Sequence, residues 1–155
     1  MEVVLGHFKN LKQMKSLFLL TILGLLSYQL SAQCKGFTKR NCLPELSPYL
    51  SNGQFNAANM IPGESADVEI NFNKGLSYRL VVCADPALEN LTYEIKDNEG
   101  FVYTTDTIKG KSSYTDIEVT QSKALTLSLN IPEQENTTGI VRNGCVSILV
   151  GFKEP

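Results

Sequence analysis

Residues 124–131 read Ala-Leu-Thr-Leu-Ser-Leu-Asn-Ile, and this stretch decides the fold class. Leu125, Leu127, Leu129 and Ile131 alternate with small polar residues. Successive side chains of a β-strand point to opposite faces of its sheet, so a period of two places all four apolar side chains on one face. The stretch therefore predicts a strand that is buried on one side and solvated on the other.

The same period recurs at short intervals from Ala66 onwards. In the first of these segments Val68, Ile70 and Phe72 alternate with Asp67 and Glu69. Turn sequences such as Asn73-Lys74-Gly75 and Lys109-Gly110-Lys111 separate the segments. The predicted strands are residues 66–72, Ser77–Cys83, Leu91–Lys96, Gly100–Thr105, Ser113–Thr120, Ala124–Ile131 and Cys145–Phe152. We expect an all-β fold, an antiparallel two-sheet sandwich of about seven strands.

The N-terminal region has the order of a secretory signal peptide. Lys9, Lys12 and Lys15 precede an apolar run over residues 17–26, and small residues follow up to Ala32. The run is about half as long as the ~20 residues that a membrane-spanning helix needs. We predict a signal peptide over residues 1–32 with cleavage after Ala32; Met14 is an alternative start, which would make residues 1–13 an upstream extension.

Residues 33–65 lack a steady apolar period and contain Pro44, Pro48, Pro62 and the turn pair Asn52-Gly53. We predict an irregular, disulfide-bonded lead-in with at most one turn of helix, followed by the sandwich over residues 66–155. Bulky Gln33 stands where a lipoprotein signal needs a small residue, so lipidation of Cys34 is the less favoured alternative.

All four cysteines, Cys34, Cys42, Cys83 and Cys145, follow the predicted cleavage point. An even number in an exported domain predicts disulfides, with three possible pairings. Cys83 ends one predicted strand and Cys145 begins another, and each lies opposite the apolar face of its strand. Antiparallel neighbours bring such ends together, so we predict the pairs Cys83–Cys145 and Cys34–Cys42.

Charge and residue usage exclude several partners and reactions. After residue 32 there are eleven basic and fifteen acidic residues and no basic stripe, so we expect no binding to nucleic acid and no membrane span. The single histidine, His7, precedes the cleavage point, which excludes histidine-based catalytic triads and histidine-ligated zinc from the mature chain. We expect no enzyme activity, no cofactor and no metal.

Three sets of residues are weaker candidates for chemistry. Asp67, Glu69 and Glu94 could form a carboxylate pair for glycoside hydrolysis, but strand alternation places them on a solvated face. Lys111-Ser112-Ser113 could form a catalytic Ser/Lys arrangement, but the neighbouring Gly110 indicates a turn. The acidic turn Asp97-Asn98-Glu99-Gly100, with Asp106, could offer oxygen ligands to calcium, although it also reads as an ordinary hairpin turn.

Aromatic residues are candidates for a sugar-binding or protein-binding surface. The available residues are Tyr78, Tyr93, Tyr103, Tyr114, Phe101 and Phe152, and most of these six fall on the predicted inward faces. Core positions are the better interpretation for these, and the absence of tryptophan disfavours a carbohydrate-binding module. We expect Tyr49 and Phe55 in the lead-in to be the most exposed aromatic residues.

The order of segments resembles a known family type. Phe72-Asn73-Lys74-Gly75 leads into Tyr78-Arg79-Leu80, then Tyr93–Gly100 follows, and the chain closes on Val146–Phe152. Over residues 66–152 this order resembles the small β-sandwich domains of pre-peptidase C-terminal type, and small secreted bacterial β-sandwich proteins of unassigned function match equally well. The resemblance implies a non-catalytic domain with a role in secretion, solubility or adhesion.

The sequence thus predicts an exported, non-catalytic β-sandwich module, periplasmic, on the outer surface or secreted, that binds a partner or serves a structural role. The alternative is an adhesin-like or inhibitor-like protein that engages one target protein through its loops. A small carboxylate-based hydrolase is the third hypothesis. The sequence does not identify the partner; a protein or glycan on the cell surface is a candidate.

Overall fold

The computed structural model describes residues 32–135 and 139–154. The predicted signal segment up to residue 31 lies outside this range. Within the described residues no helix is long and apolar enough to cross a membrane. From Cys34 onwards the chain forms one unit, and the following description concerns that unit.

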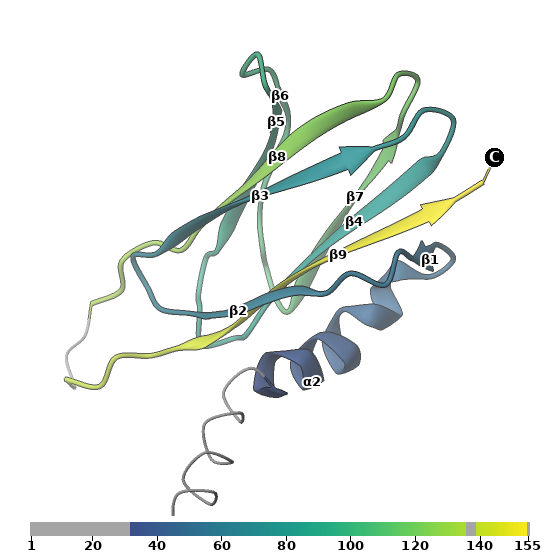
Figure 1. The fold of residues 1–155 in the computed structure, drawn as a ribbon. Helices are drawn as coiled ribbons and strands as arrows, with labels where there is room; N and C mark the ends of the chain where they lie inside the picture. Colours follow the sequence, from purple (N-terminus) through teal and green to yellow (C-terminus); the bar gives the residue numbers. More distant parts are fainter. Residues whose placement is uncertain (1–31, 136–138, 155) are drawn as a thin grey trace, which may run out of the picture. The chain divides into compact units, whose positions relative to one another are not determined.

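Strands dominate this unit, as the period of two predicts (Figure 1). The described residues form a ten-residue helix, α2 (Ala32–Asn41), and a short 3-10 turn, η1 (Leu43–Leu46). They also form the strands β1 (Leu50–Ser51), β2 (Asn56–Met60), β3 (Ser65–Phe72), β4 (Ser77–Ala84), β5 (Thr92–Asp97), β6 (Val102–Thr107), β7 (Ser112–Glu118), β8 (Lys123–Asn130) and β9 (Gly144–Lys153). Strands β3 to β9 match the seven predicted segments closely.

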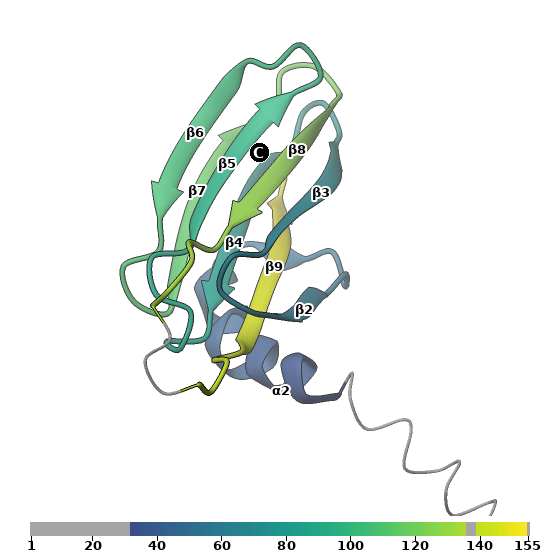
Figure 2. The ribbon, with the colours of Figure 1, turned by 90° about the vertical axis from the view of Figure 1, so that its left-hand side faces the viewer.

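The strands form two antiparallel sheets packed face to face, which confirms the predicted sandwich (Figure 2). Sheet A has the order β1-β9-β4-β7, with β2 also paired to β9. Sheet B has the order β3-β8-β5-β6. Sheet A is therefore centred on β9 and β4, whereas β6 and β3 are the edges of sheet B.

The core between the sheets comes from the alternating positions that the sequence indicates. Leu125 and Leu127 on β8 and Tyr93 on β5 face Leu80 on β4 and Ile148 on β9, and all five are buried. Burying side chains of this size stabilises the fold by about 1.5–3 kcal/mol each. The period of two thus identifies this core correctly.

The outer face of β4 and β9 is buried as well, which the period of two does not predict. Val81 and Cys83 on β4 and Leu149 on β9 have no solvent exposure, although they point away from the main core. They pack with Phe37 from α2 and Leu46 from η1 in a second, smaller cluster. Sheet A consequently has a helix on its outer side (Figure 1).

The segment that consists of α2 and η1 covers the outer face of sheet A, and we call it the cover. Both disulfides join this cover to sheet A. Cys34 pairs with Cys145 on β9, and Cys42 pairs with Cys83 on β4. The Cα–Cα distances of 5.3 and 5.9 Å fall in the usual range for a disulfide. Bonds of this kind are typical of proteins that fold in an oxidising compartment.

The predicted pairing is therefore wrong, and the helix explains why. Cys42 follows Cys34 by eight positions, and in a helix eight positions span about 12 Å, too far for one disulfide. Cys83 and Cys145 do share the outer face, as predicted, but Cys83 stands opposite Ser147 and not opposite Cys145. Each strand cysteine instead meets a helix cysteine.

The N-terminal segment is disulfide-bonded as expected, but it is more regular than expected and belongs to the sandwich. Helix α2 replaces the predicted single turn, and β1 and β2 extend sheet A along β9. The sandwich thus includes residues that we predicted to precede it. The N-terminal segment packs closely against β9, since a Cβ atom on Gly151 would lie 2.8 Å from both Leu46 and Tyr49.

We predict that each disulfide stabilises the fold by an amount set by the loop it closes. The chain-entropy relation gives about 5 kcal/mol for the Cys34–Cys145 pair and about 4 kcal/mol for the Cys42–Cys83 pair, taken singly. The paired variants Cys34→Ser/Cys145→Ser and Cys42→Ser/Cys83→Ser should both unfold at lower urea concentration than the wild type. Non-reducing peptide mapping of the wild type checks the pairing; a Cys34–Cys42 peptide would contradict it.

Candidate functional site

The carboxylates considered for hydrolysis lie on the outer face of sheet B. Asp67 and Glu69 are exposed on the edge strand β3, and Glu94 is on β5. The strand register aligns Asp67 with Ser128 and Ser128 with Glu94, so two strand spacings, about 10 Å, separate the two carboxylate-bearing backbones. The Glu94 carboxylate lies 3.8 Å from Lys96 Nζ, as in an ordinary surface ion pair.

The serine after Lys111-Ser112 takes part in a hydrogen-bond network between the sheets. Ser113 Oγ donates to Asp106 Oδ2 at 2.6 Å and lies 3.2 Å from the Tyr93 hydroxyl. The Ser113 hydrogen bond and the Thr107 amide hold the pKa of Asp106 below its ordinary value. These contacts join the edges of the two sheets.

The acidic turn and Asp106 do not converge as a calcium site would require. Asp97 Oδ1 accepts the amides of Glu99 and Phe101, at 3.0 and 2.9 Å, whereas Asp106 makes its bonds to Thr107 and Ser113. Within the described residues no group of three or more His, Cys, Asp or Glu side chains is placed to hold a metal ion. Asp97 acts here as the organiser of a hairpin turn.

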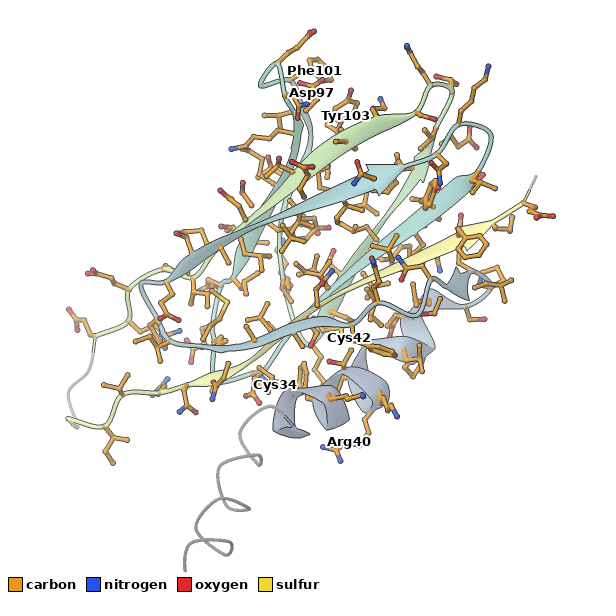
Figure 3. The ribbon with its side chains drawn as sticks, viewed as in Figure 1. Cys34, Arg40, Cys42, Asp97, Phe101 and Tyr103 are labelled. Atoms are coloured by element: carbon orange, nitrogen blue, oxygen red, sulfur yellow. A yellow bond between two sulfur atoms is a disulfide. The ribbon has the colours of Figure 1, made fainter. Side chains whose placement is uncertain are left out.

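That hairpin, between β5 and β6, presents three consecutive apolar side chains to solvent. Figure 3 labels two of them, Phe101 and Tyr103, beside Asp97. Phe101 is 63% exposed, Val102 43% and Tyr103 40%. Isolated exposed apolar residues are ordinary on a protein surface, but a contiguous group indicates an interaction site. We call residues 101–103 the apolar tip.

The apolar tip is held in a defined conformation. Asp97 Oδ2 accepts the Tyr103 hydroxyl at 3.1 Å, and the same hydroxyl accepts Lys123 Nζ at 3.0 Å. Lys123 Nζ also lies 4.5 Å from the centre of the Tyr103 ring, a cation–π distance. The chain Lys123–Tyr103–Asp97 therefore ties the tip to β8 of the same sheet.

The charge of Asp97 depends on these bonds. Partial desolvation raises the pKa of its carboxyl, but the Phe101 amide, the Tyr103 hydroxyl and the Glu99 amide together with the Lys123 charge outweigh that effect. The net pKa lies below its ordinary value. Asp97 is consequently ionised at neutral pH, the state in which it accepts all three bonds.

The prediction that Tyr49 and Phe55 are the most exposed aromatic residues is wrong. Tyr49 and Phe55 are half-buried, and Phe55 packs against the second core cluster. Phe101, Tyr103 and Tyr114 are the aromatic residues exposed by more than a third among the described residues. The signal was present in the sequence: Phe101 directly follows a turn glycine, where strand alternation gives no guide to burial.

A second aromatic cluster lies on the outer face of sheet A, and its function is structural. The Arg79 guanidinium makes two bonds to Asp116, at 2.7 and 2.8 Å, and lies over the rings of Tyr114 and Tyr49. Its remaining nitrogen donates to the Ser47 carbonyl at 2.8 Å. The hydrogen bond from Arg79 keeps the pKa of Asp116 below its ordinary value. Arg79 thus fastens the segment after η1 to β4.

Comparison with known proteins leaves the chain without an assigned family. No protein-family model matches it, and no curated protein matches it. Among solved structures it is similar to a "de novo designed double-stranded beta-helix" determined by solution NMR, at 14% identity and a TM-score of 0.34. The match covers 64% of this chain and 99% of that one, and at this TM-score it carries no argument about function.

We predict that replacing Asp97 by alanine loosens the apolar tip. The substitution removes the acceptor for the amides of Glu99 and Phe101, so the Phe101 amide should exchange with solvent about tenfold faster. Asp67→Ala, which removes an exposed carboxylate on β3, is the matched control and should leave this rate unchanged. Equal rates in wild type and Asp97→Ala would show that Asp97 does not order the tip.

The hydrogen bonds of Asp97 also determine in which direction its contribution to stability changes with pH. Because the folded-state pKa of Asp97 is lowered, its stabilisation is complete above the unfolded-state pKa, near 4, and is lost as the pH falls through the folded-state value. An NMR titration of the Asp97 carboxyl should have its midpoint below 3.8.

Proposed function

We propose that this protein is an exported, non-catalytic module that binds a partner protein through the apolar tip of its β5–β6 hairpin. The single observation that carries the proposal is the contiguous exposure of Phe101, Val102 and Tyr103 on a turn fixed by Asp97. The two disulfides support a destination in the periplasm, on the outer surface or outside the cell. The non-catalytic role agrees with the one implied by the resemblance to pre-peptidase C-terminal type domains.

The geometry of the two rings favours a protein over a glycan as the partner. Phe101 and Tyr103 meet edge to face, with ring centres 5.0 Å apart and ring planes at 80°. A sugar stacks on a flat aromatic surface, whereas these rings form a ridge, and Lys123 lies over the Tyr103 ring. A ridge of this kind fits a concave apolar site on another protein.

A fixed tip also lowers the entropic cost of binding. Aromatic side chains bring a large apolar area with few rotatable bonds, and they dominate the energetics of many interfaces. The hydrogen bonds of Asp97 order the tip before the partner arrives. Less conformational entropy is then lost when the complex forms.

Site-specific photo-crosslinking in the producing cells tests the proposal. A photoreactive phenylalanine analogue at Phe101 should give one discrete adduct of the exported protein that contains peptides of a second protein. The matched control position is Tyr114, which is 53% exposed and belongs to the Arg79 cluster on sheet A. An analogue placed there should not give the same adduct.

The purified partner then allows a quantitative test. Phe101→Ala should weaken binding by at least about tenfold, the effect of losing one central aromatic anchor, while Tyr114→Ala should leave the affinity unchanged. Identical adducts from both positions would contradict the proposal. An adduct whose added mass is removed by glycosidases and contains no peptides of a second protein would assign the tip to a glycan instead.

A further inference from the structure

The free edge of β2 differs in its charge from the edges that β3, β6 and β7 form. The four exposed residues Asn56, Ala57, Ala58 and Asn59 form most of β2, which pairs with β9 on one side and with no other described strand. Residues 46–63 contain no charged side chain. The two-residue edge strand β1 is also uncharged, but the longer edge strands all carry exposed acidic residues: Asp67 and Glu69 on β3, Asp106 on β6, and Asp116 and Glu118 on β7.

This contrast matters because a free strand edge is a template for pairing with another chain. Proteins protect such edges with charged side chains, and like charges facing each other across a strand pair are destabilising. Two copies of an acidic edge therefore repel one another. Among the described edge strands of more than two residues, β2 is the one without such protection.

We propose that β2 pairs with β2 of a second copy of this chain, antiparallel and about a two-fold axis between Ala57 and Ala58. The sequence Asn-Ala-Ala-Asn reads the same in both directions, so this register sets Asn56 against Asn59 of the second copy and Ala57 against Ala58. A two-fold interface requires a self-complementary surface of this kind. The small alanine side chains allow the close approach of an antiparallel pair.

The dimer is weak and concentration-dependent. A pairing of four residues per strand buries less than the ~1,600 Å² of a standard interface. We expect a dissociation constant on the order of 100 µM, which places the transition in the range accessible to analytical ultracentrifugation. Because β2 and β6 occupy edges of different sheets, pairing through β2 does not use the residues of the apolar tip, and the proposal is independent of the proposed function.

Two double variants that differ in one residue test both the interface and its register. Asn56→Lys/Asn59→Lys places like charges opposite each other and should abolish association. Asn56→Lys/Asn59→Glu places lysine opposite glutamate in both symmetry-related pairs and should associate at least as tightly as wild type. A further control, Thr105→Lys/Thr107→Lys on β6, should associate like wild type.

Sedimentation from about 10 µM to 1 mM, the range around the expected constant, gives the readout. The wild type should pass from the mass of one chain towards that of two, and equal thermal midpoints should show that all variants are folded. A wild type that keeps the mass of one chain throughout would overturn the proposal. Equal weakening of association in the two Asn56/Asn59 variants would also overturn the proposal, because it would reject the register. Loss of association in the β6 variant would overturn it as well, because the interface would then lie at β6.

Discussion

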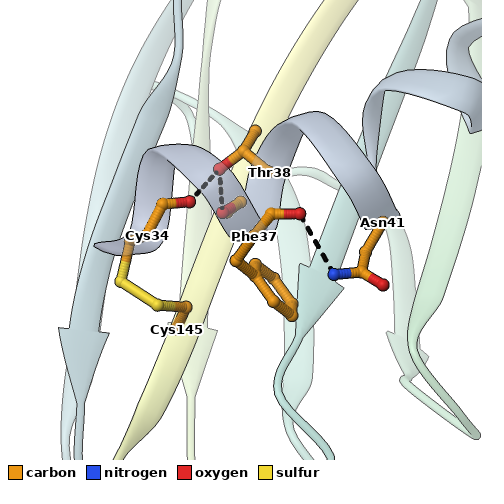
Figure 4. Close-up of a disulfide and its surroundings, with 6 residues drawn as sticks. Cys34, Phe37, Thr38, Asn41 and Cys145 are labelled. Atoms are coloured by element: carbon orange, nitrogen blue, oxygen red, sulfur yellow. Dashed lines mark hydrogen bonds between the residues drawn. A yellow bond between two sulfur atoms is a disulfide. The ribbon is translucent and has the colours of Figure 1, made fainter. Parts of the chain in front are cut away.

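The fold depends on covering the outer face of β4 and β9. Val81 and Leu149 on this face are fully buried, and they would be exposed in a sandwich that consisted of the two sheets alone. Helix α2 and η1 remove them from water, and the Thr38 hydroxyl meets the Ser147 hydroxyl at 2.7 Å, so that the polar groups beneath the helix are also paired (Figure 4). Two disulfides hold this cover at both ends of the helix.

This arrangement leaves the outer face of sheet A covered by structural contacts and leaves surfaces of sheet B available for binding. The covered face of sheet A is occupied by structural contacts, including those of the Arg79 guanidinium with Asp116 and Ser47. The apolar tip of the β5–β6 hairpin belongs to sheet B and takes no part in that cover. A stable, cross-linked scaffold with a rigid exposed loop is the arrangement by which loops commonly carry binding functions.

Much of the fold could be predicted from the sequence, because strands β3 to β9 bury alternate residues and have turn residues between them. The cover could not be predicted from that pattern, although its signals were present. Cys34, Phe37, Thr38 and Cys42 are spaced as one face of a helix, and Leu149 is apolar at a position that alternation assigns to solvent. The disulfide pairing failed for the same reason, since it assumed a non-helical lead-in. At the hairpin, core positions were the better interpretation for a set of aromatic residues that includes Phe101 and Tyr103. Alternation gives no guide there, because a turn and a register shift between Ile95 and Lys96 interrupt it.

Native-state hydrogen exchange of the oxidised protein tests most directly whether α2 is an integral layer of the fold. If the helix covers sheet A as described, the amide of Cys42, which bonds to the Thr38 carbonyl at 2.9 Å, should exchange as slowly as the amides in the centre of β4 and β9, near the limit of global unfolding. Fast exchange of the α2 amides beside fully protected β4 and β9 amides would contradict this account. It would show that the sandwich is stable without its cover.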